Sequence, residues 1–371
     1  MGDAADIAMK RWRYIWVLYA LLLCLVQPVG ADTLTEDLEK ALPPEAEVLL
    51  EDLDGEEVDM HTLPEGLARL WDGACAAFGD VLRGSLRGVV LLLGVVLLCA
   101  VVSDCMEASG NGAIPNFTPM AGAMAITLIA AGNLHTMMGV GVETIEELDI
   151  FSKALLPTLS AAVAAGGGVV TAGFRQVASI FFAELLISLI RGVLLPLVYI
   201  YIAAAAANAM LPGQRLKLVG KAISKCITWL LTGLLLLYTG FLTFSGAMTG
   251  SADALTVQLT RSAMGTVPVV GGIISDAAGT VLAGAATVKN AVGIVGMLAV
   301  LALCLMPFLR LAVQYLLYKL AAFLAGTVGS PDLMELIESL GGAFGMILGM
   351  TAACALLLLI SIATTITVVT I

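Results

Sequence analysis

Charged residues and histidines are scarce in this 371-residue chain. Only 13% of the residues are charged, and the two histidines, His61 and His135, lie far apart. This spacing predicts no histidine-based metal site. The seven cysteines include no CxxC pair and predict no disulfide framework. We expect neither a metal nor another cofactor.

The sequence also lacks the common catalytic motifs. It contains no GxxxxGK[ST] phosphate-binding loop, no HExxH and no GxSxG. We therefore expect no enzymatic activity and no transport driven by ATP hydrolysis in this chain.

Apolar residues, in contrast, are abundant: they make up 60% of the chain, and the mean hydropathy is +1.00. Apolar runs of about 18 residues or more indicate membrane-spanning helices. The sequence predicts an all-α, polytopic, glycine-rich helical membrane protein whose transmembrane domain covers residues 86–371. Eight apolar elements are expected, at roughly 86–103, 117–134, 154–173, 177–209, 226–247, 266–286, 290–320 and 341–366.

The first 31 residues have the order of a secretory signal peptide. Three basic residues, Lys10, Arg11 and Arg13, precede a short apolar run that ends before small residues at Val29 and Ala31. This order predicts a signal peptide over residues 1–31, with a cleaner start at Met9. An uncleaved first transmembrane helix is the alternative.

An acidic segment follows, over residues 32–85. Between residues 32 and 80 there are 15 acidic residues and two basic ones, Lys40 and Arg69, a net charge of −13 against −11 for the whole chain. We expect this segment to be extracytoplasmic, either as a solvated tether or as a docking surface for a partner. Its acidity disfavours nucleic acid.

Glycine and proline predict where the apolar elements bend or pack. Gly166, Gly167 and Gly168 can break the third element, and Gly271-Gly272 the sixth, into re-entrant or half-helical pieces. Pro196 and Pro307 predict kinks in the two longest elements. Gly341, Gly345 and Gly349 are spaced four apart and predict a smooth helix-packing face, used within the chain or between copies.

Two segments 111 residues apart share a pattern that suggests an internal repeat. Gly168 to Pro196 corresponds to Gly279 to Pro307. The basic stretch 212–225 is expected in the cytoplasm by the positive-inside rule, and the acidic stretch 328–340 outside, as an inverted repeat requires. Eight full spans would place 212–225 outside, so one earlier element, with 154–173 as the candidate, is expected not to span.

Ionisable residues within apolar runs are costly and mark candidate sites. They are Glu184, Arg191, Asp276 and Arg310. Glu184 and Arg191 are seven residues apart and share a helix face. Two roles remain open for the four residues: structural pairing between helices, or lining of a conduction or substrate pathway. Lys289 and Lys319 are expected to extend their amines toward water near span ends.

Three stretches carry a resemblance to a known family. They are Leu70-Trp71-Asp72 in the acidic segment, Leu159-Ser160-Ala161-Ala162 through Gly168, and Arg191-Gly192-Val193-Leu194-Leu195-Pro196-Leu197. With the order of signal peptide, acidic segment and glycine-rich membrane domain, the chain resembles the stage III sporulation protein AE family of endospore-forming Firmicutes.

The resemblance implies a sporulation role in the mother-cell membrane around the engulfed forespore. It implies membership of a multi-protein apparatus that links the two cells, with an Oxa1/YidC-type insertase as partner for membrane insertion. It supplies no catalytic residues. Two alternatives stay open: a self-contained secondary transporter with a site near Glu184, Arg191 and Asp276, and a purely structural membrane scaffold.

Overall fold

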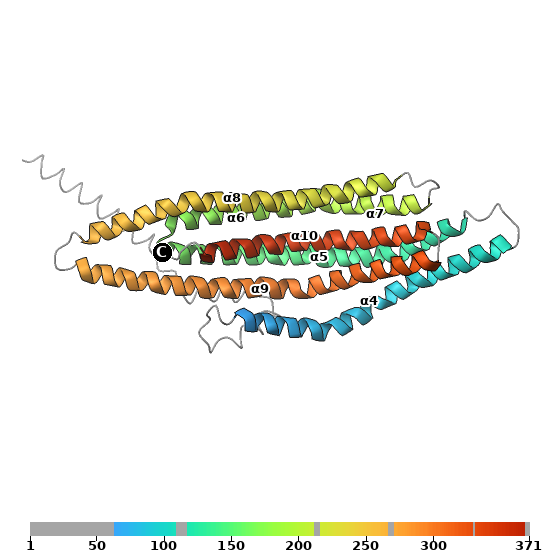
Figure 1. The fold of residues 1–371 in the computed structure, drawn as a ribbon, viewed down its shortest axis with the longest axis horizontal. Helices are drawn as coiled ribbons and strands as arrows, with labels where there is room; N and C mark the ends of the chain where they lie inside the picture. The colour runs from blue at the N-terminus through green and yellow to red at the C-terminus, as the bar shows by residue number, and fades with distance from the viewer. Residues whose placement is uncertain (1–62, 109–116, 211–215, 266–270, 329–330, 368–371) are drawn as a thin grey trace, which may run out of the picture. The chain divides into compact units, whose positions relative to one another are not determined.

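A computed structural model describes residues 63–108, 117–210, 216–265, 271–328 and 331–367, and every element in them is a helix (Figure 1). The elements are α4 (Leu63–Ala108), α5 (Phe117–Ala165), α6 (Val169–Leu189), the π-helical turn η1 (Ile190–Leu194), α7 (Leu195–Met210), α8 (Lys217–Gly265), α9 (Gly271–Val328) and α10 (Pro331–Thr367). The predicted signal peptide and residues 32–62 lie outside the described residues. The predicted fold class, an all-α polytopic membrane protein, is confirmed.

Six helical segments of the described chain are long and apolar enough to cross a membrane, and α6, η1 and α7 together form one of them. The eight expected elements are therefore a miscount. The elements 266–286 and 290–320 are both part of α9, and the element 154–173 is divided between α5 and α6. Polar residues interrupt the hydropathy between the two elements of α9, whereas the helical backbone continues through them.

The glycine triplet at residues 166–168 separates two helices. Ala165 is the last residue of α5 and Val169 the first of α6, and Gly167 adopts φ 94°, a left-handed conformation that favours glycine. The chain reverses direction here, so the triplet forms a tight turn between antiparallel helices and no re-entrant or half-helical piece. Gly271 and Gly272 instead begin α9.

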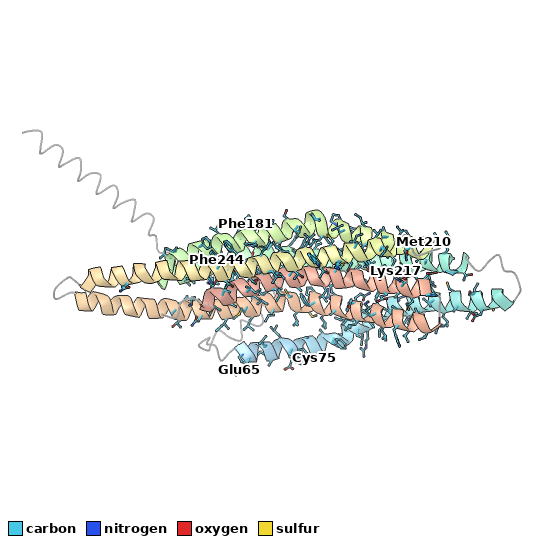
Figure 2. All side chains as sticks on the ribbon, turned by 45° about the horizontal axis from the view of Figure 1, so that its top comes forward. Glu65, Cys75, Phe181, Met210, Lys217 and Phe244 are labelled. Atoms are coloured by element: carbon cyan, nitrogen blue, oxygen red, sulfur yellow. The ribbon has the colours of Figure 1, made fainter. Side chains whose placement is uncertain are left out.

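Successive long helices are antiparallel, so the bundle has two ends (Figure 1). At the Met210 end, α7 leads to α8 and α9 leads to α10, and Lys217 contacts Glu335 at 2.8 Å (Figure 2). At the Gly167 end, α5 leads to α6. In the half of the bundle nearer that end, Ser179 of α6 contacts Ser361 of α10 at 2.7 Å.

This arrangement corrects the expected topology. The described parts of the basic and acidic stretches, residues 217–225 and 331–340, both lie at the Met210 end, on the same side, because Lys217 and Glu335 form an ion pair. The segments proposed as an inverted repeat, Gly168–Pro196 and Gly279–Pro307, both run from the Gly167 end toward the Met210 end. They are parallel, so the inverted relation is wrong.

The helix count also removes the parity conflict. Three spans, α4, α5 and α6–α7, precede residues 212–225. With the acidic segment outside, three crossings place the basic stretch in the cytoplasm, in agreement with the positive-inside rule. The prediction of an extracytoplasmic acidic segment therefore implies that the Met210 end is cytoplasmic.

The helices are longer than a bilayer requires. α5 and α8 have 49 residues each and α9 has 58. At 1.5 Å per residue, α9 is about 87 Å long, whereas the hydrocarbon core is about 30 Å thick. α9 is therefore much longer than the hydrocarbon core is thick.

Apolar packing holds the bundle together. α9 and α10 form its most closely packed hairpin, with α5 and α4 against them. Leu70 of α4 packs against Ile294, Leu298 and Ala302 of α9. α4 thus runs without interruption across residue 85, where the acidic segment was predicted to end, and its first turns belong to the bundle.

Candidate functional site

Glu184 and Arg191, the predicted intramembrane pair, both face α5. Glu184 accepts a contact from Lys153 Nζ at 2.7 Å, and Lys153 also contacts Asp149 at 2.9 Å. Arg191 Nη2 contacts Glu146 Oε1 at 2.6 Å. Each predicted residue therefore has its own partner on α5, and the two do not share one.

These ion pairs lie at the surface of the described bundle. The paired side chains of Glu184, Lys153, Arg191 and Glu146 are about half exposed. An ion pair that meets lipid or a partner there compensates the cost of placing charge in a poorly solvated region. This geometry favours ion pairs that connect α5 to α6 and η1 over the lining of an enclosed conduction pathway.

The local backbone explains where Arg191 lies. It belongs to η1, the π-helical turn directly before Pro196. Proline has no N–H to donate to a carbonyl four residues earlier, and widened turns occur where the regular ladder is interrupted. Pro307, in contrast, lies inside α9, which is assigned as α-helix from Gly271 to Val328.

The two other predicted polar residues, Arg310 and Asp276, belong to α9. Arg310 is on α9, is exposed, and has no ion-pair partner among the described residues. The backbone at Asp276 belongs to α9, but its side chain lies outside the described residues. Among Glu184, Arg191 and Arg310, whose side chains the structure describes, none contacts another of the three.

The burial of two cations was not foreseen from the sequence. Arg175 on α6 is 5% exposed, and Lys289 on α9 is 2% exposed. Lys289 Nζ donates to the Ile366 carbonyl of α10 at 2.8 Å, near the negative end of that helix. The expectation that Lys289 extends toward water is wrong, because the amine is held inside the bundle.

Arg175 lies in a polar layer between α6, α8 and α10. Ser179 Oγ shares hydrogen bonds with Ser361 Oγ at 2.7 Å and with the Tyr238 hydroxyl at 3.1 Å. Arg175 was overlooked, and Lys289 was taken for a span-end residue, because their charges had been used to divide the apolar runs at 174–176 and 287–289. A buried charge on an otherwise apolar helix is the signal that would have found them.

The predicted glycine face packs against α9 in part. A Cβ atom at Gly341 would lie 3.1 Å from Tyr318 Cβ, and one at Gly345 would lie 3.1 Å from the Tyr315 ring. Gly349 has nothing within 4 Å of that position. Gly341 and Gly345 therefore allow α10 to approach α9 closely within one chain.

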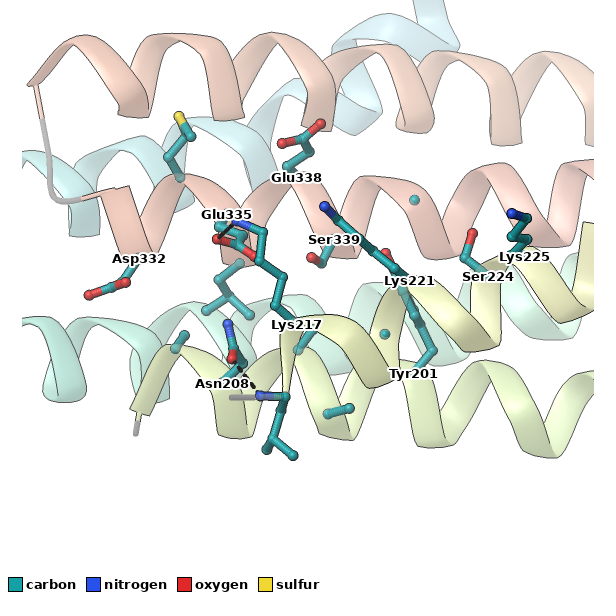
Figure 3. Close-up of a pocket in the computed structure, with 18 of the residues that line it drawn as sticks. Tyr201, Asn208, Lys217, Lys221, Ser224, Lys225, Asp332, Glu335, Glu338 and Ser339 are labelled. Carbon is teal, nitrogen blue, oxygen red and sulfur yellow. Dashed lines mark hydrogen bonds and ion pairs between the residues drawn. The ribbon is translucent and has the colours of Figure 1, made fainter. Parts of the chain in front are cut away.

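A charged pocket of about 600 Å³ opens at the Met210 end, between α7, α8, α9 and α10 (Figure 3). Its charged lining comes from both polar stretches: Lys217, Lys221 and Lys225 on α8, Lys319 on α9, and Asp332, Glu335 and Glu338 on α10. Two ion pairs at 2.8 Å, Lys217–Glu335 and Lys319–Glu338, join α10 to its neighbours. Groups of three or more potential metal ligands are absent from the described residues.

Comparison with known proteins gives one consistent result. The sequence model of the family described as stage III sporulation protein AE matches residues 55–369. The stage III sporulation protein AE of Bacillus subtilis (strain 168) is 23% identical over 292 residues, which cover 78% of this chain and 73% of that protein. No solved structure matches.

Proposed function

Because this chain belongs to the stage III sporulation protein AE family, we propose that it is a permease-like or platform subunit of an apparatus between mother cell and forespore. It acts in the mother-cell membrane around the forespore, and it is needed for forespore development after engulfment. Its partners are the other membrane proteins of that apparatus, with an Oxa1/YidC-type insertase for insertion. It performs no catalysis and binds no nucleic acid.

The observation that carries the proposal is the length of the helices. α4, α5, α8 and α9 have 46 to 58 residues each, between two and three times the roughly 20 that a bilayer needs. The excess turns exceed the thickness of a bilayer and offer helical surface on which other subunits can dock. A protein that acts alone within the bilayer has no need of such extensions.

The ion pairs give further support. In a self-contained transporter, the alternative, Glu184 and Arg191 would contribute to one substrate site with Asp276. Glu184 and Arg191 are instead each engaged by α5 at the surface. This favours a structural use of the two residues.

An in-frame deletion in the source organism, followed by fluorescence imaging of sporulating cells, tests the proposal. We expect normal vegetative growth, completed engulfment, and then small or collapsing forespores. Normal spores in the deletion strain would overturn the proposal.

Complementation separates the apparatus from the transporter. One variant lacks residues 32–62, a boundary chosen because α4 begins at Leu63 and packs on α9. The other is Glu184→Gln. As an apparatus subunit, the truncated chain should reach the membrane in normal amounts without restoring spores, whereas Glu184→Gln should restore them. The opposite pattern would support a self-contained transporter.

A further inference from the structure

The pocket at the Met210 end contains more positive charge than its acidic residues neutralise. Glu335 and Glu338 are each engaged by a lysine, Lys217 and Lys319 respectively. Lys221 and Lys225 line the same pocket but form no ion pair or hydrogen bond with any described residue. With Asp332 as the third carboxylate, the four lysines of the lining leave a net charge of +1, and Lys221 and Lys225 lie one turn apart on α8.

The pocket has room for such an anion. It encloses about 600 Å³ and presents Tyr201, Ser224 and Ser339 as polar groups besides the lysines (Figure 3). Glycine at position 342 leaves space for Tyr201, since a Cβ atom there would lie 2.8 Å from the Tyr201 hydroxyl. In Figure 3, Lys221 extends from α8 toward the side of α10 that carries Ser339.

The surroundings of the pocket place it at the level of lipid headgroups. On α8, the lysines directly precede the apolar run that starts at Cys226. Leu218 and Trp229, on either side of the lysines, are 77% and 73% exposed. Exposed apolar and indole side chains beside lysines are typical of the boundary between hydrocarbon and water. Lipid chains can therefore cover Leu218 and Trp229 while a headgroup enters the pocket.

We infer that Lys221 and Lys225 bind the phosphate of an anionic phospholipid from the cytoplasmic leaflet, in the pocket between α7, α8 and α10. Basic pockets between transmembrane helices on the cytoplasmic side have the chemistry that recognises such headgroups. A soluble phosphate would satisfy the lysines equally well but would leave the exposed apolar residues at the pocket's edge without a role. The inference is independent of the proposed sporulation function.

The test uses the full chain in nanodiscs of phosphatidylcholine with added phosphatidylglycerol, and native mass spectrometry counts the retained anionic lipids. We compare the wild type with Lys221→Gln/Lys225→Gln. The matched control is Arg83→Gln/Arg87→Gln, which removes two exposed cations at the same spacing on α4. We expect the lysine variant to bind phosphatidylglycerol roughly 25-fold more weakly, about fivefold for each lysine.

The control variant should retain the lipid as the wild type does, and so should Lys221→Arg/Lys225→Arg, which keeps the charge. If the double glutamine variant does not fold, Lys225→Gln alone should show about a fivefold loss. Equal lipid retention by Lys221→Gln/Lys225→Gln and the wild type would overturn the inference. An equal loss of lipid in Arg83→Gln/Arg87→Gln would also overturn it.

A second arm distinguishes the two sources of phosphate. Inorganic phosphate is added to the wild type in pure phosphatidylcholine nanodiscs, and thermal unfolding is followed. We expect no change in Tm. A rise in Tm that disappears in Lys221→Gln/Lys225→Gln would identify a soluble ligand and would overturn the assignment to lipid.

Discussion

The two ends of the bundle use cations in opposite ways. At the Met210 end, lysines are partly exposed, pair with carboxylates of α10 and surround an open pocket. Toward the Gly167 end, Arg175 and Lys289 are buried, with hydroxyls and a main-chain carbonyl as their surroundings. Water screens only the lysines at the Met210 end. Loss of a cation there should therefore change stability little, whereas reversal of a buried cation toward the Gly167 end should lower it strongly.

Exposed and buried lysines also differ in what they can do: the exposed ones can bind a ligand, and the buried ones stabilise the fold. An exposed lysine retains its hydration, so it can exchange a solvent contact for a ligand at low cost. A buried lysine has lost its hydration and depends on the carbonyl that it contacts. We therefore look for ligands at the Met210 end and for determinants of stability toward the Gly167 end.

The largest effect is expected at Lys289. Lys289→Glu would place a carboxylate against the Ile366 carbonyl and leave a buried, uncompensated charge, which costs about 3–5 kcal/mol. Thermal unfolding in detergent, with the yield of folded protein, measures this loss. Lys225→Glu, at the other end, should change stability by less than about 0.5 kcal/mol.

Lys289→Met is the uncharged control for Lys289→Glu. Methionine has a similar length without charge, and replacement of a buried charge by an apolar group is often nearly neutral. A stability of Lys289→Glu equal to that of the wild type would show that the amine at this position is solvated.

An intermediate effect is expected on the glycine face near the Met210 end. Gly345→Val would press against the Tyr315 ring, since even a Cβ atom would lie 3.1 Å from it. Overpacking of this kind costs about 1–3 kcal/mol. Gly349→Val is the matched control, because its Cβ position is open. Chemical unfolding of both variants measures the difference, and equal stability would contradict close packing of α10 on α9.

The smallest effect is expected for the Lys217–Glu335 ion pair. Both side chains are partly solvated, and such pairs contribute about 0.5 kcal/mol. A double-mutant cycle of Lys217→Gln and Glu335→Gln should give a coupling energy of that size, reduced at high salt. A coupling above about 2 kcal/mol would show that this end is as poorly solvated as the other.

Part of the fold followed from local sequence. The break at Gly166-Gly167-Gly168 was predicted, because consecutive glycines permit the left-handed conformation that Gly167 adopts, but its form as a turn between two antiparallel helices was not. The number of helices was not, because hydropathy reports where a segment is solvated and not where its hydrogen bonding stops. α5 continues as helix through Glu146, Asp149 and Lys153, which had appeared to divide two elements.

The candidate sites show the same limit. Glu184 and Arg191 were recognisable from their cost within an apolar run. Their partners were not, since Glu146 is 45 residues away from Arg191 and Lys153 is 31 away from Glu184. The charged pocket could not be predicted from the sequence either, because it forms only where two stretches more than 100 residues apart meet.

By itself, the sequence determined the solvent and the class of this protein. Its apolar content requires a membrane, and backbone hydrogen bonding in lipid then requires helices. Only the tertiary structure decided which charges are paired, which are buried and which stay open for a ligand. The reason is physical: the cost of a charge depends on the atoms around it, and helices distant in sequence supply those atoms.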